Sequence, residues 1–162
     1  MQRSFWLVAA LAVSNFLSGC GKKEKKEDPV PARTKLNMLV DHEWIITGAT
    51  TTSGSRAVNV FGTSLYEECK RDNILQFASA NNSNTYKRLE NTVVCVPSMA
   101  ESGNWTLSPD YTKLTLKPTA TSGATATREY AVVEITDTSL KISYQDELLS
   151  SPMTIVESYK VR

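Results

Sequence analysis

Three cysteines carry the most definite side-chain chemistry in this sequence of 162 residues. Cys20 ends a segment that begins with the basic residue Arg3 and continues through an unbroken apolar run over residues 5–13. The small residues Ser18 and Gly19 directly precede this cysteine. Such an order is the layout of a secretory signal, and the apolar run is too short to cross the ~30 Å hydrocarbon core of a bilayer as a stable helix. The sequence therefore predicts that residues 1–19 are a signal peptide and that the chain is exported.

The segment Leu17–Cys20, with the sequence LSGC, resembles a bacterial lipobox. This resemblance implies that Cys20 is lipidated and becomes the first residue of the mature chain. Several acyl chains, palmitate among them, would then hold the protein at a membrane, since one chain alone gives only marginal binding. Gly21 stands where an acidic residue retains some lipoproteins in the inner membrane. The expected location is therefore the cell envelope, lipid-anchored at the outer membrane, and the sequence leaves open whether the domain faces the periplasm or the cell surface.

Cys69 and Cys95 are the two remaining cysteines. In an exported protein, two such thiols most often form a disulfide. The alternative is two free thiols or half of a metal site, but a metal ion would need further ligands and His42 is the only histidine. The pair also lacks the CxxC spacing of redox-active cysteines. We predict a structural disulfide between Cys69 and Cys95, and no metal.

The sequence contains no pattern typical of a catalytic site. No serine lies in a Gly-x-Ser-x-Gly elbow, and no glycine-rich phosphate loop is present. Paired carboxylates such as Glu67 and Glu68 are sequence neighbours beside loops, which is typical of solvated turns. A lone histidine such as His42 is most often a surface residue. We therefore expect no catalytic residue, no cofactor and no enzymatic activity.

Charge is balanced over the chain, with 18 basic and 17 acidic residues. From Leu36 onward, 11 basic residues stand against 14 acidic ones. Binding to a phosphate backbone requires a basic face. We therefore expect no nucleic-acid partner.

Residues 20–35 differ in composition from the rest of the mature chain. The stretch GKKEKKEDPVPAR after Cys20 is charged, contains two prolines and has Val30 as its one large apolar residue. It cannot bury enough apolar surface to order itself, so residues 20–35 are predicted to be a lipidated, flexible tether. Residues 36–162 are long enough for one folded domain with its own core.

Most of this domain has the composition of short strands, with β-branched and aromatic residues between clusters of Gly, Pro, Asn, Asp and Ser. Leu36–Val40 is predicted to be a helical turn or an entry segment, and Val58–Glu68 fits either a short helix or a strand. Alternation is clearest at Leu140, Ile142 and Tyr144, which share one strand face. The predicted strands are Glu43–Thr51, Asn73–Ala78, Thr85–Arg88, Val93–Val96, Asn104–Ser108, Lys113–Lys117, Thr127–Thr136, Ser139–Gln145 and Thr154–Val161. One-sided strands joined by tight turns favour an antiparallel meander that curls into a barrel to hide its edges.

Several short motifs occur in a characteristic order. They are Trp44 at the start of the first strand, Cys69 followed by KRDN and then Phe77, Cys95 followed by SGNWTL and KLTL, and Tyr130 in a strand followed by TSLKI. Over about residues 36–162 this order resembles the lipocalin-like domains of Bacteroidetes lipoproteins. The resemblance implies an all-β, antiparallel up-and-down barrel of about eight strands with an apolar cavity and no catalytic residues. The sequence departs from the broader lipocalin signature at His42, where that signature has glycine two positions before the tryptophan.

Inward-facing residues of such a barrel are the candidates to line a ligand cavity. Trp44 is interpreted as plugging the barrel, and Trp105 fits either a plug or a cavity wall. Glu157 shares the alternating face of Ile155 and Tyr159, which would aim a carboxylate inward, where it would need a partner or a ligand. We favour instead a bulge in the final strand that turns Glu157 to solvent. The candidate lining residues are Trp44, Phe77, Trp105, Leu116, Ile142, Tyr144, Glu157 and Tyr159.

The expected function is that of a non-enzymatic, membrane-anchored envelope lipoprotein whose barrel binds or carries a small hydrophobic ligand. The alternative is a protein-interaction or structural module of the envelope with a filled barrel. Its contact loops would be Thr50–Arg56 and Thr119–Thr127, which are rich in Thr, Ser and Gly. The expected partners are the membrane, through the N-terminal lipid, and either a small hydrophobic ligand or an envelope protein, and the chain is expected to be monomeric.

Overall fold

A computed structural model describes residues 33–53, 56–64, 66–119, 126–148 and 151–162. The predicted signal peptide, Cys20 and most of the tether lie outside the described residues, as do most of the expected contact loop Thr119–Thr127 and part of Thr50–Arg56. Within the described ranges, no helix is long and apolar enough to span a bilayer. The first element, α1 (Lys35–Val40), is the helical turn expected before the first strand.

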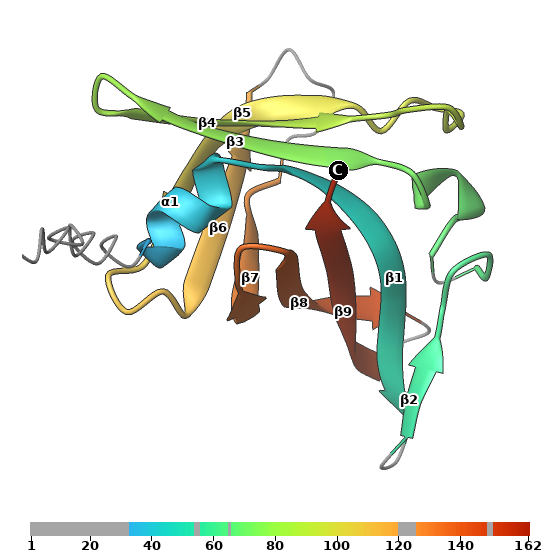
Figure 1. Cartoon of the computed structure of the whole chain (residues 1–162). Coiled ribbons are helices and arrows are strands. Elements are labelled where there is room, and N and C mark those ends of the chain that lie inside the picture. Colours follow the sequence, from blue (N-terminus) through green and yellow to red (C-terminus); the bar gives the residue numbers. More distant parts are fainter. Residues whose placement is uncertain (1–32, 54–55, 65, 120–125, 149–150) are drawn as a thin grey trace, which may run out of the picture. The chain divides into compact units, whose positions relative to one another are not determined.

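The wall of the domain is an antiparallel sheet that closes on itself (Figure 1). Its strands are β1 (Glu43–Ser53), β2 (Arg56–Asn59), β3 (Ile74–Ala80), β4 (Ser83–Leu89), β5 (Glu101–Leu107), β6 (Lys113–Pro118), β7 (Arg128–Ile135), β8 (Ser139–Leu148) and β9 (Ser151–Val161). Consecutive strands from β3 to β9 are hydrogen-bonded neighbours, and β1 pairs with both β3 and β9. β2 pairs with the end of β1 as a side hairpin. Eight of the described strands therefore form a closed up-and-down barrel, which confirms the predicted fold class.

Alternating apolar residues form the inner face of this barrel. Leu114 and Leu116 in β6 and Leu140 and Ile142 in β8 are each at most 1 % exposed, while the residues between them are not buried. Burying one such side chain stabilises the fold by roughly 1.5–3 kcal/mol. The period-2 pattern read from the sequence thus decides which face of each strand makes the core.

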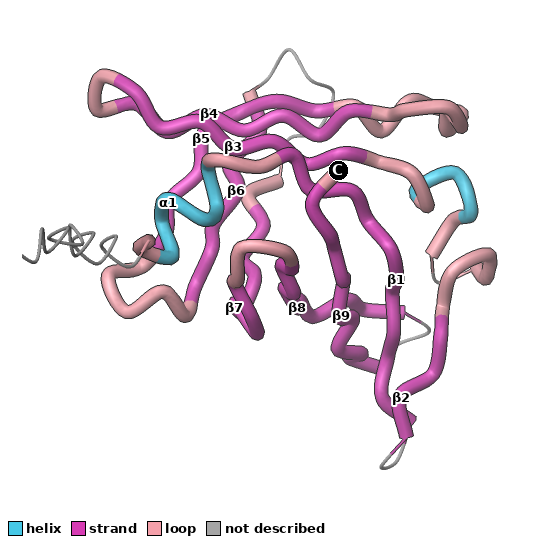
Figure 2. Tube along the Cα trace, viewed as in Figure 1, coloured by secondary structure: helices cyan, strands magenta, loops and turns pink. Residues whose placement is uncertain are grey.

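One end of the barrel is closed by α1. Thr34 caps this helix by accepting a hydrogen bond from the backbone N–H of Asn37. Leu39 is fully buried, and its carbonyl accepts the indole N–H of Trp44 at 2.9 Å. His42, at the position where glycine was expected, packs its ring edge-on against Trp44 with the centroids 5.4 Å apart. Figure 2 shows α1 and the short 3₁₀ helix η1 (Glu68–Lys70) at opposite ends of β3.

The predicted strand Val93–Val96 is wrong, because this segment is a loop between β4 and β5. Its backbone N–H groups bond to side chains rather than to a neighbouring strand: Asp72 accepts from Val93, and Glu90 accepts from Cys95. The valines are not drawn into the core, since Val96 is 97 % exposed. β-branched residues alone therefore did not produce a strand here, because the strands of the closed sheet already pair with one another.

Several strand boundaries also differ from the prediction. β5 begins at Glu101, before the predicted start at Asn104, and β8 and β9 extend to Leu148 and Ser151, beyond the predicted ends at Gln145 and Thr154. The ambiguous segment Val58–Glu68 contains the end of β2, two isolated bridges and the start of η1.

The disulfide between Cys69 and Cys95 is present, with the Cα atoms 5.2 Å apart, which confirms the predicted pairing. Cys69 lies in η1 and Cys95 in the β4–β5 loop. The disulfide therefore joins the segment before β3 to the loop before β5, at the end of the barrel where these two strands begin.

Gly103 marks a close approach of two neighbouring strands. A Cβ atom at this position would lie 2.1 Å from the carbonyl oxygen of Lys117 and 2.7 Å from the Cα of Pro118. The substitution Gly103→Ala is expected to lower the free energy of unfolding by about 2–3 kcal/mol, because both obstructing groups are backbone in a closed sheet. Urea denaturation followed by circular dichroism measures this loss.

Gly48→Ala is the matched control, since a Cβ there meets nothing nearer than the Cβ of Ser158 at 3.9 Å. This variant is expected to stay within about 0.5 kcal/mol of the wild type. Equal stability of the two variants would contradict the close contact at Gly103.

Candidate functional site

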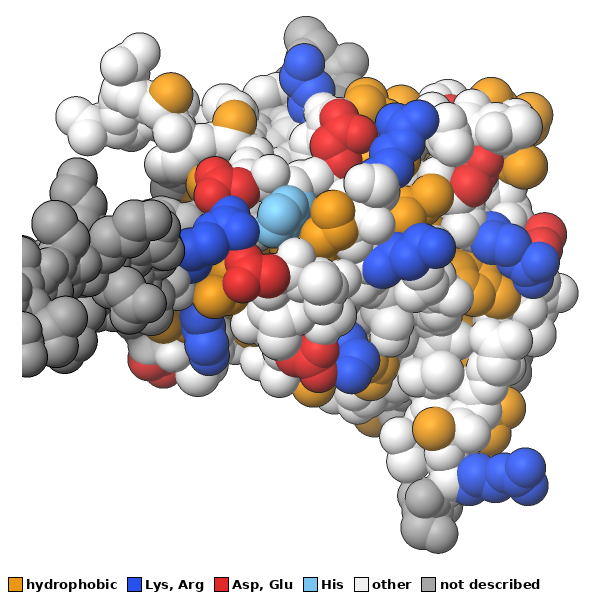
Figure 3. Space-filling model, in the orientation of Figure 1, with side chains coloured by type: hydrophobic (Ala, Val, Ile, Leu, Met, Phe, Trp, Pro, Cys, Tyr) orange, Lys and Arg blue, Asp and Glu red, His pale blue; other side chains and the backbone are white. Residues whose placement is uncertain are grey.

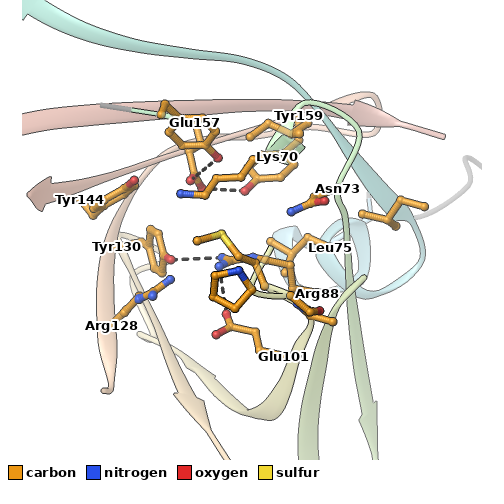
Figure 4. A pocket seen from close by; sticks show the side chains of 17 residues that line it. Lys70, Asn73, Leu75, Arg88, Glu101, Arg128, Tyr130, Tyr144, Glu157 and Tyr159 are labelled. Carbon is orange, nitrogen blue, oxygen red and sulfur yellow. Dashed lines mark hydrogen bonds and ion pairs between the residues drawn. The ribbon is translucent and has the colours of Figure 1, made fainter. Parts of the chain in front are cut away.

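A cavity of about 410 Å³ lies at the end of the barrel where β3, β5 and β7 begin (Figure 4). Part of its wall is apolar and comes from β1, β3 and the residues that precede β5. The apolar lining residues are Ile46, Ile74, Leu75, Pro97, Met99 and Ala100. The remaining wall is polar and is rich in tyrosine and charge. Its residues are Tyr66, Lys70, Asn73, Arg88, Ser98, Glu101, Arg128, Tyr130, Tyr144, Glu157 and Tyr159.

The loop that forms one side of this cavity is held in shape by Glu90. One carboxylate oxygen of Glu90 accepts the backbone N–H groups of Cys95 at 3.0 Å and Met99 at 2.9 Å, and the other accepts the hydroxyl of Ser98 at 2.6 Å. These bonds, with that from Met99 the strongest, lower the pKa of Glu90 below its ordinary value. Together with the disulfide at Cys95, they fix the segment that carries Pro97, Ser98 and Met99 to the cavity.

Glu157 points into the barrel and is 5 % exposed, so the predicted turn to solvent is wrong. β9 pairs with β8 in an unbroken register through Glu157, and the irregularities of the barrel lie in β1 and β7 instead. The carboxylate is satisfied by two hydroxyl donors: Tyr66 donates to Oε1 at 2.9 Å and Tyr159 to Oε2 at 2.6 Å. Burial, and then the nearby charge of Glu157, raise the pKa of both tyrosines well above the ordinary value. Both hydroxyls therefore remain protonated donors to Glu157.

Arg88 lies at the centre of the second polar cluster. Its Nη1 pairs with Oε1 of Glu101 at 3.0 Å, and its Nη2 donates to the hydroxyl of Tyr130 at 3.3 Å. The side chains of Arg88 and Glu101 are 13 % and 4 % exposed, which makes this a buried ion pair. Arg128 lies beside Tyr130 (Figure 4).

Comparison with protein families shows that residues 40–142 match the family described as a lipocalin-like domain. The matched stretch is more than half of the chain and runs from the end of α1 into β8. The chain belongs to the lipocalin-like domain family. Comparison with curated proteins finds no match. β9 lies outside the matched stretch, and it completes the lipocalin-like barrel by pairing with β1 and β8.

Three of the eight residues predicted to line the cavity of this lipocalin-like barrel do so: Tyr144, Glu157 and Tyr159. The other five are buried in the core and do not line this cavity. They are Trp44, Phe77, Trp105, Leu116 and Ile142, each at most 4 % exposed.

Packing within the barrel explains this outcome. Trp44 is the plug that was expected, with its indole bonded to α1. Trp105 packs edge-on against Phe77 at 5.6 Å between centroids, and its indole N–H is shared between the carbonyls of Ala78 and Thr85. The aromatic residues therefore fill the core, and the cavity lies beyond them.

Glu157 apart, the charged residues of the cavity were not predicted from the sequence. Arg128 and Tyr130 are two residues apart in one predicted strand, so the period-2 rule was a usable signal that both face inward. The same rule places Arg88 on the inner face of β4 with the buried Tyr86. Glu101 carried no such signal, because it lay before the predicted strand Asn104–Ser108.

Glu67, Cys69 and Cys95 are a cluster of metal-ligand types within the described residues, with their ligand atoms within 4.8 Å of one another. Both cysteine sulfurs are consumed by the disulfide. The exposed carboxylate of Glu67 is then the one remaining ligand group of this cluster. The cluster is therefore a disulfide with an acidic neighbour.

Tyr86 is a buried residue whose hydroxyl has no hydrogen-bond partner within the described residues. Leaving a buried hydroxyl unpaired costs roughly 1–3 kcal/mol. Tyr86→Phe is therefore expected to raise the free energy of unfolding by about 1 kcal/mol at neutral pH. Denaturant titration measures the gain, and Tyr111→Phe, in the β5–β6 turn, is the control expected to stay within about 0.5 kcal/mol.

The same variant has a distinct pH dependence. Burial, and then Glu101, raise the pKa of Tyr86 from 10.0 to about 12. A group whose pKa is higher in the folded chain than in the unfolded chain contributes stability at pH values below its unfolded-state pKa. That contribution is lost as the pH rises toward the folded-state pKa. Stability should therefore fall between about pH 10 and pH 12, and Tyr86→Phe should lose less over this window than the wild type. An identical alkaline loss in both proteins would contradict the buried position of this hydroxyl.

Proposed function

We propose that this protein is a lipid-anchored lipoprotein of the cell envelope whose lipocalin-like barrel binds a small molecule with an apolar body. The observation that carries the ligand-binding part is the cavity of about 410 Å³ at one end of the barrel. Sites for small ligands begin at roughly 300 Å³. A barrel of eight strands has an interior just wide enough for side chains or one small ligand, and here the side chains leave space.

The proposed activity is binding without a catalytic step. The two carboxylates of the cavity, Glu101 and Glu157, are engaged by Arg88 and by the hydroxyls of Tyr66 and Tyr159. These contacts hold both carboxylates in fixed positions as acceptors. Such groups are suited to fixing the orientation of a ligand.

Fluorescence titration with phenylnaphthylamine, an uncharged apolar probe, tests the cavity. We expect one probe to bind per chain with increased fluorescence, and Ala100→Trp, which places an indole in the cavity wall, to weaken binding at least about tenfold. Ala57→Trp, at an exposed position of β2, is the matched control and should bind like the wild type. Equal binding by Ala100→Trp, or no binding by the wild type, would contradict the proposed ligand site.

The anchor is tested at Cys20. Replacing Cys20 by serine removes the thiol that would carry the acyl chains, so the variant should move from the membrane fraction to the soluble fraction and lose incorporation of labelled palmitate. Unchanged partitioning of Cys20→Ser would overturn the proposed lipid anchor and leave the ligand proposal standing.

A second function, binding to an envelope protein, is favoured by an apolar patch on the β4–β5 loop. Val93, Val94 and Val96 are 46 %, 59 % and 97 % exposed. By contrast, the face drawn in Figure 3 shows basic and acidic side chains interspersed over the surface. This second function predicts a barrel filled throughout, whereas the described barrel leaves a cavity of about 410 Å³ at one end, so the geometry supports ligand binding better.

A further inference from the structure

We infer that the ligand of this cavity is an anionic amphiphile, whose negatively charged group binds between Arg88 and Arg128 while its apolar body lies against the apolar part of the lining. This inference rests on the proposed ligand-binding function and adds the chemical class of the ligand.

Two guanidinium groups lie near one phenol in the cavity. Arg88 donates to the hydroxyl of Tyr130 at 3.3 Å, and Arg128 lies beside Tyr130 (Figure 4). Figure 4 shows Arg88 reaching from β4 toward Arg128 and Tyr130 of β7. Like charges repel one another, and an anion between them would relieve that repulsion. Guanidinium groups also match the geometry of carboxylate, sulfonate and phosphate oxygens.

The existing carboxylates pair with only one of these two guanidinium groups. Glu101 is engaged by Arg88, and Glu157 lies across the cavity, where both of its oxygens accept tyrosine hydroxyls. Arg128 forms no ion pair with a carboxylate among the described residues. It is exposed, so an incoming ligand can reach it from solvent.

The charges of the whole lining lead to the same conclusion. The cationic side chains are Lys70, Arg88 and Arg128, against the carboxylates of Glu101 and Glu157. Lys70 pairs with Glu67, outside the lining, at 3.8 Å, and Arg88 pairs with Glu101. Arg128 is therefore the cation of the described lining that a monoanionic ligand would pair with. A cationic ligand would add to the charge of Arg128 and would find both carboxylates already bonded.

The apolar part of the lining, which includes the direct cross-strand neighbour of Arg88, favours an apolar body on the same molecule. Ile74, Leu75 and Met99 contribute their side chains to the cavity. An ion without an apolar part would leave this surface in contact with water. A ligand that consists only of uncharged hydrocarbon would bury the guanidinium groups without supplying an opposite charge, which costs free energy.

The test compares two probes that differ by one charged group, bound to the full-length chain with its disulfide formed. Anilinonaphthalene sulfonate carries a sulfonate on the apolar framework of phenylnaphthylamine. We expect the sulfonate probe to bind about tenfold more tightly than the uncharged probe, equivalent to about 1.4 kcal/mol. Arg128→Gln should remove most of this difference and leave the affinity for phenylnaphthylamine within about twofold. Lys117→Gln, which removes the same charge from an exposed position of β6, is the control and should change neither affinity.

Each outcome has a separate meaning. Equal binding of both probes to the wild type, or a sulfonate preference that survives Arg128→Gln, would overturn the anionic ligand while the proposed function stands. No binding of either probe would overturn the proposed function itself. If Arg128→Gln weakens both probes equally, the residue shapes the cavity and the charge pairing is refuted. Arg128→Lys keeps the charge and should retain part of the sulfonate preference, so it provides the same test if the glutamine variant fails to fold.

Discussion

Replacing Arg88 by methionine is expected to lower the free energy of unfolding by about 3–5 kcal/mol. Arg88 is the ion-pair partner of Glu101, whose side chain is 4 % exposed. Without the guanidinium, a carboxylate stays buried with no compensating charge, and that cost far exceeds the packing change from arginine to methionine. Urea denaturation at neutral pH measures the loss.

The double variant Arg88→Met with Glu101→Met is the control for this prediction. Replacing a buried ion pair by apolar residues of similar volume is often neutral or stabilising. We therefore expect the double variant to recover most of the stability that the single variant loses. A double variant that is as unstable as Arg88→Met would show that packing around Arg88, rather than the unpaired carboxylate, determines the loss.

Removing the disulfide by Cys69→Ala with Cys95→Ala is expected to lower the free energy of unfolding by about 3.5 kcal/mol in the chain-entropy description. The two cysteines are 26 residues apart, so the bond removes many conformations from the unfolded chain. Denaturant titration of the oxidised wild type and the double variant measures the difference. Since Cys95 lies in the loop that brings Pro97 and Met99 to the cavity, phenylnaphthylamine should also bind the variant more weakly.

Reduction of the wild type is the matched control, because it breaks the same bond without changing the sequence. The reduced wild type should be about as unstable as the double variant. Peptide mapping under non-reducing conditions should yield one joined peptide that contains Cys69 and Cys95. Free thiols at both positions in the native oxidised protein would contradict the pairing.

Strands that alternate over many residues could be predicted from the sequence, because the period of two is set by backbone geometry. β8 shows this at Leu140 and Ile142, and β6 at Leu114 and Leu116. The segment Val93–Val96 could not be assigned in this way. Its conformation depends on Asp72 and Glu90, which lie in other segments and accept its backbone N–H groups.

The candidate site was less predictable because its polar groups satisfy one another across the barrel. Glu157 was expected to turn outward, since an unpaired buried carboxylate is costly. In the structure, one of its partners is Tyr66, 91 residues away in sequence, and no local pattern reveals that contact. The aromatic residues Phe77 and Trp105 were expected in the cavity wall, yet they pack against each other and fill the core. Composition indicated which residues are inside, but mutual packing decided which of them border empty space.

The chain purified from its own cells and examined intact by native mass spectrometry provides the most direct test of a ligand in the barrel. The cavity of about 410 Å³ predicts a retained non-covalent molecule, in addition to any covalently bound lipid, and Ala100→Trp should lose it. A wild-type chain that carries no such molecule, even after incubation with lipid extracts of the same cells, would contradict the account.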